Sequence, residues 1–235
     1  MTLSLYACGS YQRILGRSID VSVCQATVSR CIKEITLALN HPDVLTRCIK
    51  FPVTPEERAV VIRRLVFICY AALNIINVDA RLPGSVTDNL IWQASPARQV
   101  VEQAYWNDRC WLLGDNGYFT APWLHVPVIN ASPGTPEFIY TQVHCRARNV
   151  VERCIGVLKS RWRLLCSDRC INYKDAAYAG QMINACCVLH NFCNGNRVDP
   201  PAPLIENNVD HGAEVEPPPE MPFDVYRLGQ QEQQF

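Results

Sequence analysis

The spacing of apolar residues divides the chain into three regions. Residues 1–65 have helical periodicity, with QRILGRSI followed by a break at Asp20 and then by CQATVSRCIKEITLALN. In the second segment an apolar set recurs at the spacing of one helix face: Val28, Cys31, Ile32, Ile35 and Leu39. Two short helices about a tight turn outline a helix-turn-helix, and a plain helical hairpin is the competing interpretation. In the first case these residues at the start of the second helix would reach bases or phosphates: Gln25, Thr27, Ser29 and Arg30.

Residues 66–195 mix the two periodicities. Four short apolar runs predict strands: VFICYA, NIINVDA, CWLLGD and LHVPVI. The segment DNLIWQASPARQVVEQAYW is helical in pattern apart from Pro96, and a strongly periodic helix follows from Arg148 to Arg163. This alternation predicts an α/β or α+β layered domain. Residues 196–235 are rich in Pro and acids and poor in apolar residues, so we expect a disordered tail.

Composition narrows the class of protein. The 235 residues, 49% of them hydrophobic, are enough for one or two domains with a real core. No stretch approaches the length of apolar sequence that spans a bilayer, and the N-terminus lacks the features of a signal peptide. We therefore expect an intracellular protein without a membrane partner.

The net charge of zero conceals an uneven distribution. Residues 199–235 hold eight acids and one base, so the tail carries −7 and the remaining body +7. Within the body, Gln142–Lys174 holds eight Lys or Arg against two acids. This segment is either a phosphate-binding surface or a solvated helix face, and charge alone does not separate the two.

Thirteen cysteines are many, but the number is odd and no CxxC pair recurs at zinc-ribbon spacing. Most are therefore expected to be reduced, buried side chains. Cys187, His190 and Cys193 fall on one face of a predicted helix. That face is a candidate metal arrangement or, as we favour, ordinary core.

Two acids stand out by position. Asp115 follows the predicted strand at Gly-Asp-Asn-Gly, where a turn is the simplest explanation. Glu152 is the one acid on a helical stripe that also holds Arg148, Lys159 and Arg163, and a salt bridge to Arg148 or Lys159 would account for it. The alternative is that the two carboxylates meet at a magnesium site on a nucleic-acid backbone, because Mg²⁺ takes hard oxygen ligands together with water and phosphate.

Four segments give this second interpretation a specific form: PGSVTDNLIW, LLGDNGYFTAPWLHVPV, HCRARNVVERCIGVLKSRWRLL and VLHNFC. Together they resemble the Harbinger (PIF/Harbinger) group of DDE transposases and their transposase-derived nuclease relatives. The similarity runs in order over most of residues 5–195, and the N-terminal segment also resembles the helix-turn-helix of that family.

The resemblance implies a ribonuclease-H-like core with an Asp, Asp, Glu triad that cuts DNA with Mg²⁺ or Mn²⁺. Asp115 matches the second acid and Glu152 the third, while Asp88 matches another acid of the family near the metal. The cations Arg148, Lys159 and Arg163 would then hold the DNA backbone. A Myb-like DNA-binding partner and residence in the nucleus, with the cytoplasm as a second location, are further expectations.

The family pattern is broken at the first acid. The expected segment of the type I-D-G-T-H is missing where the chain passes from Arg64 to Val66, so a block of several tens of residues is absent there. We expect a truncated ribonuclease-H-like domain with a mixed sheet that lacks its central first strand, and an impaired nuclease; Asp79 is the one candidate substitute. A non-catalytic DNA-binding or partner-binding protein, and a gene model that lacks an exon, are the alternatives.

Overall fold

The computed structural model describes residues 1–9, 22–51, 69, 72–80, 88–166 and 175–201. Along this part of the chain the elements are α1 (Thr2–Cys8), α3 (Gln25–Leu39), α4 (Pro42–Cys48), α6 (Asp88–Ala94), α7 (Pro96–Asp108), β1 (Leu112–Leu113), β2 (Leu124–His125), α8 (Pro136–Arg161), the 3₁₀ turn η1 (Arg163–Leu165) and α9 (Ala176–Gly195). The protein is mixed α/β and mostly helical, with a small parallel sheet. Among these helices none combines the length and apolar character of a transmembrane span.

Two helices begin at a hydroxyl residue followed by proline. The Ser95 side chain accepts a hydrogen bond from the backbone N–H two residues on, at 3.3 Å, and Pro96 is the first residue of α7. Thr135 accepts from the N–H three residues on, also at 3.3 Å, and Pro136 opens α8. Proline lacks the N–H that a first helical turn leaves unpaired. A hydroxyl residue followed by proline therefore favours the start of a helix at both places. The predicted helix around Pro96 is therefore two helices, α6 and α7.

Helix α8 is longer than predicted, and its expected apolar face is buried in part. We expected it from Arg148 to Arg163, but it begins at Pro136 and ends at Arg161. Its periodicity also predicted an apolar face made of Val151, Ile155, Leu158 and Trp162. Trp162 is buried, and Val151 and Leu158 pack against buried core residues, whereas Ile155 is 45% exposed.

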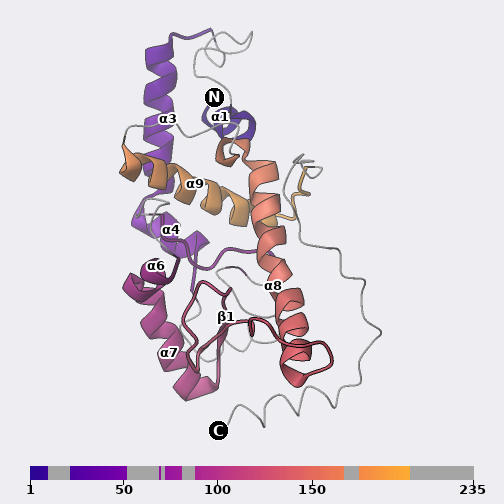
Figure 1. The fold of residues 1–235 in the computed structure, drawn as a ribbon. Helices are drawn as coiled ribbons and strands as arrows, with labels where there is room; N and C mark the ends of the chain where they lie inside the picture. Colours follow the sequence, from indigo (N-terminus) through magenta and orange to yellow (C-terminus); the bar gives the residue numbers. More distant parts are fainter. Residues whose placement is uncertain (10–21, 52–68, 70–71, 81–87, 167–174, 202–235) are drawn as a thin grey trace.

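The upper half of the molecule is a helical core (Figure 1). Helix α3 was predicted from its periodicity and is confirmed, whereas QRILGRSI lies outside the described residues. Tyr6 of α1 and Thr36 of α3 are fully buried, and their hydroxyl groups hydrogen bond at 2.6 Å. Residues from α8, η1 and α9 complete this cluster, including Trp162, Leu164 and Met182.

The predicted strand NIINVDA is not a strand. Ile75 forms one isolated bridge with Cys69, and its backbone groups pair with a side chain instead: its N–H donates to Oδ1 of Asn191 at 2.8 Å, and its carbonyl accepts from Nδ2 at 2.6 Å. The amide of Asn191 on α9 thus replaces a neighbouring strand. The predicted strand VFICYA lies outside the described residues except for Cys69, so the expected loss of a central strand stays a prediction.

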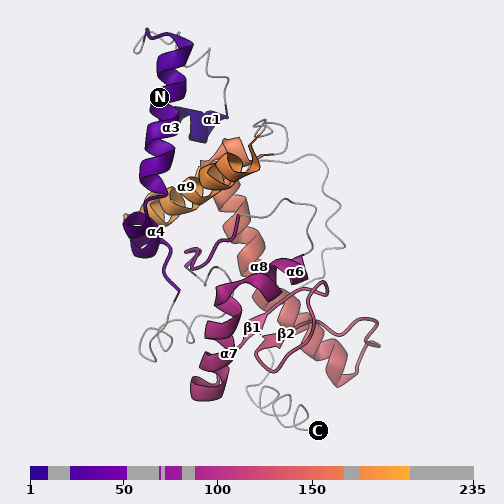
Figure 2. The same ribbon diagram turned by 90° about the vertical axis from the view of Figure 1, so that its left-hand side faces the viewer.

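The sheet consists of β1 and β2, which are parallel, with Leu112 opposite Leu124 and Leu113 opposite His125. These strands are confirmed but are two residues each, shorter than the predicted runs. Figure 2 shows the pair between helices α7 and α8. The C-terminal end of β1 therefore lies where a side chain can face α8.

Candidate functional site

Asp115 lies in the tight turn that follows β1. Its Oδ1 accepts a hydrogen bond from the backbone N–H of Gly117 at 3.0 Å, and the N–H of Tyr118 donates to its carbonyl at 3.2 Å. At Gly114, just before it, a Cβ atom would lie 3.0 Å from the Tyr118 ring and 3.3 Å from Leu124. The predicted turn is therefore present, and it leaves Oδ2 of Asp115 available to a partner.

That partner is Arg148 on helix α8. Its Nη2 lies 3.3 Å from Oδ2 of Asp115, and its Nη1 lies 3.1 Å from Oε1 of Glu152 one turn further along the helix. One guanidinium thus joins the carboxylates of Asp115 and Glu152, which are 37 residues apart in the sequence. The same arrangement therefore contains the salt bridge from Glu152 to Arg148 and brings Glu152 near Asp115.

The arrangement is only partly shielded from water. The side chains of Arg148 and Asp115 are 28% and 32% exposed, and that of Glu152 is 53% exposed. Nε of Arg148 is buried and has no hydrogen-bond partner within the described residues. The guanidinium is therefore held by its two outer nitrogen atoms, and both carboxylates keep an open side.

Two histidines lie beside this arrangement, and neither was predicted from the sequence. His144 precedes Arg148 by one helical turn, and its Nε2 lies 3.2 Å from the carbonyl oxygen of His125 at the end of β2. Burial lowers the pKa of His144, and the same cause lowers the pKa of His125, so both are neutral at pH 7. The sequence contains a signal that could have found His144, because His144, Arg148 and Glu152 follow one another at the four-residue spacing of one helix face.

Asp88, the third acid predicted near the metal, is the first residue of α6. Its side chain lies outside what the structure describes. The adjacent residue, Asn89, accepts a hydrogen bond through Oδ1 from the backbone N–H of Phe119 at 3.4 Å. Because Phe119 lies four residues after Asp115, the start of α6 is next to the loop that carries this carboxylate.

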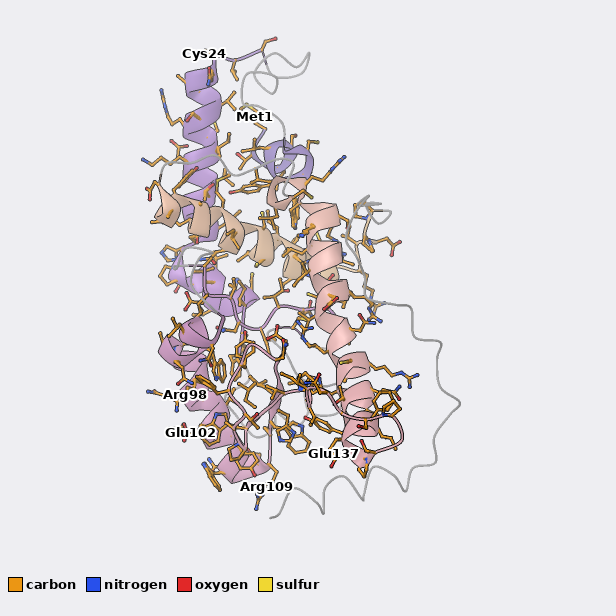
Figure 3. The ribbon with its side chains drawn as sticks, viewed as in Figure 1. Met1, Cys24, Arg98, Glu102, Arg109 and Glu137 are labelled. Atoms are coloured by element: carbon orange, nitrogen blue, oxygen red, sulfur yellow. The ribbon has the colours of Figure 1, made fainter. Side chains whose placement is uncertain are left out.

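The residues predicted to bind nucleic acid lie in three places: at the start of α3, on α8 and in the turn η1. Gln25, Thr27 and Arg30 are at the start of α3, which Figure 3 marks by the label of Cys24, at the end of the molecule opposite Glu137 and the sheet. Thr27 is partly buried, and its hydroxyl lies 3.3 Å from Sγ of Cys24. The structure therefore does not bring this helix end together with Asp115 and Glu152.

The predicted cationic stripe on α8 is also shorter than expected. Lys159 is partly buried on the last turns of the helix. Arg163 is exposed but follows the end of α8, in the turn η1, so it does not continue the stripe. Arg148 is the member of the stripe that the structure brings to the carboxylates.

The face of α9 that holds Cys187, His190 and Cys193 belongs to the core. Nε2 of His190 donates to the carbonyl oxygen of Leu73 at 2.7 Å. Burial raises the pKa of Cys187 to about 12, which keeps its thiol protonated. No group of three or more metal-ligating side chains occurs among the described residues. The interpretation of this face as ordinary core is thus the one that fits.

Comparison with known proteins places this chain in a family. A family model described as DDE superfamily endonuclease matches residues 63–191. The protein named "Putative nuclease HARBI1" of Homo sapiens is 28% identical over 231 aligned positions, covering 81% of this chain and 64% of that protein. Its Xenopus laevis counterpart is 27% identical, with 84% and 67% covered, and "Protein ALP1-like" of Arabidopsis thaliana is 24% identical, with 51% and 32% covered.

The chain thus spans 64% of the length of the human relative. The 231 aligned positions exceed the residues that 81% of this chain supplies, so the alignment opens gaps in this chain. No solved structure gives a significant match. Since the family model covers more than half of the chain, the chain belongs to the DDE superfamily endonuclease family.

Proposed function

We propose that this chain is a transposase-derived DNA nuclease homologue that uses Mg²⁺ or Mn²⁺, with Asp115 and Glu152 among its metal ligands. One observation carries the proposal: the two carboxylates, from a strand end and a later helix, approach the same guanidinium of Arg148. Two acids that contact one guanidinium lie near each other, and a divalent cation bound by both would draw their oxygen atoms closer. The family match supports phosphodiester hydrolysis as the reaction.

The donor set fits the proposed cation. Mg²⁺ is usually held by one or two carboxylates, and water and substrate phosphate complete its coordination. Oδ2 of Asp115 and Oε1 of Glu152 would hold it, and both side chains are partly exposed, which leaves room for the phosphate. When bound, the cation would polarise the phosphodiester and lower the pKa of an attacking water.

Further residues have separate roles in the proposal. Asp88 is the candidate third ligand, because the helix that it begins is bonded to the loop after Asp115. Lys159 and Arg163 would contact the DNA backbone beyond the carboxylates, and Gln25 and Arg30 would contact DNA at the far end of the molecule. The first acid of the family pattern stays unassigned, so we expect cleavage to be weak.

Cleavage of supercoiled plasmid tests this function. With Mn²⁺ or Mg²⁺ the protein should nick the plasmid, and both Glu152→Gln and Asp115→Asn should abolish nicking. Glu102→Gln is the matched control, because Glu102 is a partly exposed helical glutamate that pairs with Arg98 one turn away, outside the site. Nicking that survives Glu152→Gln would disprove the assignment and indicate a contaminating nuclease.

A non-catalytic DNA-binding role is the second candidate, favoured by the exposed side chains of Arg30 and Arg163, and it is consistent with a first acid that stays unassigned. It predicts DNA affinity that falls steeply with salt and survives Glu152→Gln. Binding that does not change with salt would exclude a phosphate-binding surface. Sequencing the transcript across the codons for Leu65 and Val66 tests whether the missing block belongs to the natural protein.

A further inference from the structure

The guanidinium of Arg148 contacts the carboxylates of both Asp115 and Glu152. Its two outer nitrogen atoms reach Asp115 and Glu152 at 3.3 and 3.1 Å, and its side chain is 28% exposed. Its remaining nitrogen, Nε, is buried and has no hydrogen-bond partner in the described part of the chain. In this state the positive charge of Arg148 is neutralised by the acids and is not available to a phosphate.

We propose that Arg148 is an internal counter-cation of this site: it holds the two carboxylates together without metal, and a divalent cation must displace it to bind. The inference rests on the proposed function, since it assigns the metal to the same two acids. A guanidinium and Mn²⁺ that both lie between Oδ2 of Asp115 and Oε1 of Glu152 compete, because their positive charges repel at the short distance that separates them there.

Displacement would change what Arg148 can bind. A guanidinium presents paired N–H donors that match a phosphate as well as a carboxylate. Once the metal holds Asp115 and Glu152, the released guanidinium is next to the cation. It can then donate hydrogen bonds to a phosphate of the DNA backbone. Metal binding and phosphate binding are then coupled with positive sign, and the coupling is reciprocal. The order of events is metal first and DNA backbone second.

Chemical labelling of the wild-type protein tests this directly. A dicarbonyl reagent modifies accessible arginines, and mass spectrometry of peptides reports each site separately. Mn²⁺ should increase the labelling of Arg148, and a short DNA duplex should then protect it only in the presence of Mn²⁺. Arg146, which is exposed on the same helix, is the internal control and should be labelled equally in all conditions.

Metal affinity tests the competition itself. Arg148→Met removes the competing cation, so Mn²⁺ measured by electron paramagnetic resonance should bind roughly three- to tenfold more tightly, as expected for two partly exposed ion pairs. Arg146→Met should bind Mn²⁺ like the wild type. Arg148→Lys keeps the charge but not the bidentate geometry, so its Mn²⁺ affinity should lie between those of the wild type and Arg148→Met.

The outcomes separate the two proposals. If the wild type binds Mn²⁺ but Arg148→Met binds it equally or more weakly, Arg148 does not compete with the metal and this inference is wrong. The same holds if Mn²⁺ leaves the labelling of Arg148 unchanged. If neither the wild type nor Arg148→Met binds Mn²⁺, the metal site of the proposed function fails, and this inference fails with it. The labelling arm needs no variant, so a variant that does not fold leaves the test intact.

Discussion

Nε2 of His144 donates to the carbonyl oxygen of His125 across 3.2 Å, and this bond ties helix α8 to strand β2. The same carbonyl accepts a hydrogen bond from the N–H of Gly114 at 2.7 Å, directly before Asp115. One backbone oxygen thus connects β1, β2 and α8. The bond fixes the position of Arg148, one turn further along α8, relative to the turn that carries Asp115.

Replacing His144 should therefore weaken the fold locally. His144→Ala removes a buried donor and leaves a cavity between α8 and the sheet, and we expect the free energy of unfolding to fall by roughly 1–3 kcal/mol. Cys145→Ala is the matched control, because Cys145 is exposed at the next position of the helix. Urea denaturation measures both, and equal stability of the two variants would contradict the role of His144.

Folding stability should decrease as the pH falls below about 6.5, the ordinary pKa of histidine. Burial is the main cause that lowers the pKa of His125, His144 and His190, so the folded state favours their neutral forms. The unfolded chain takes up protons at higher pH than the folded chain does, so stability is full above this pH and is lost below it.

Urea midpoints between about pH 7.5 and pH 5 measure this effect before most carboxylates titrate. His190→Gln should flatten the dependence on pH, since it removes one of the three groups. A midpoint that is constant or rises as the pH falls would contradict the assignment of these histidines as buried and neutral.

Two glycines form a matched pair for a packing test. Gly180 on α9 lies against the backbone of Ala80, and a Cβ atom there would collide with the Ala80 carbonyl oxygen. At Gly156 on α8, no atom of another described residue lies within 4 Å of such a Cβ, apart from its chain neighbours and the helix's own backbone. We expect Gly180→Ala to destabilise the fold by about 1–3 kcal/mol through overpacking, and Gly156→Ala to stabilise it by about 0.5–1 kcal/mol through helix propensity. Thermal denaturation should show midpoint shifts of opposite sign.

Arg161 should be far more sensitive to substitution than its neighbour Arg163. It is buried, and its two outer nitrogen atoms donate to Oδ1 of Asn194 and to the carbonyl of Val198, each at 2.6 Å. Arg161→Met leaves both acceptors unpaired, at an expected cost of roughly 2–4 kcal/mol. Arg163→Met, at an exposed position, should change the free energy of unfolding by less than about 0.5 kcal/mol. A similar loss in both variants would contradict a special role for Arg161.

The sequence predicted the helices better than the strands, for physical reasons that particular residues illustrate. Helical periodicity is local, so α3 and the helical character of α6 and α7 could be expected from their own residues. A strand needs a partner from elsewhere in the chain. Ile75 takes its partner from the side chain of Asn191, and Pro127 has no N–H with which to extend β2. No local pattern in the sequence could reveal that Ile75 pairs with the side chain of Asn191.

The site was predictable in part. The four-residue spacing of Arg148 and Glu152 indicated their ion pair, and the strand end indicated the turn at Asp115. The approach of Asp115 to Arg148 depends on how β1 packs beside α8, so the residues alone gave no distance. His144 and Arg161 were missed because a polar side chain on a helix is expected to face solvent, and their burial follows from tertiary partners.

Helix α8 serves both halves of the molecule. Its 26 residues span about 39 Å, from the sheet to the helical core that includes α1 and α9 (Figure 1). Purifying selection for packing would therefore preserve much of this helix with or without nuclease activity. Under the proposed function, the residues whose drift would report lost chemistry are those that the core does not use, with Glu152 foremost.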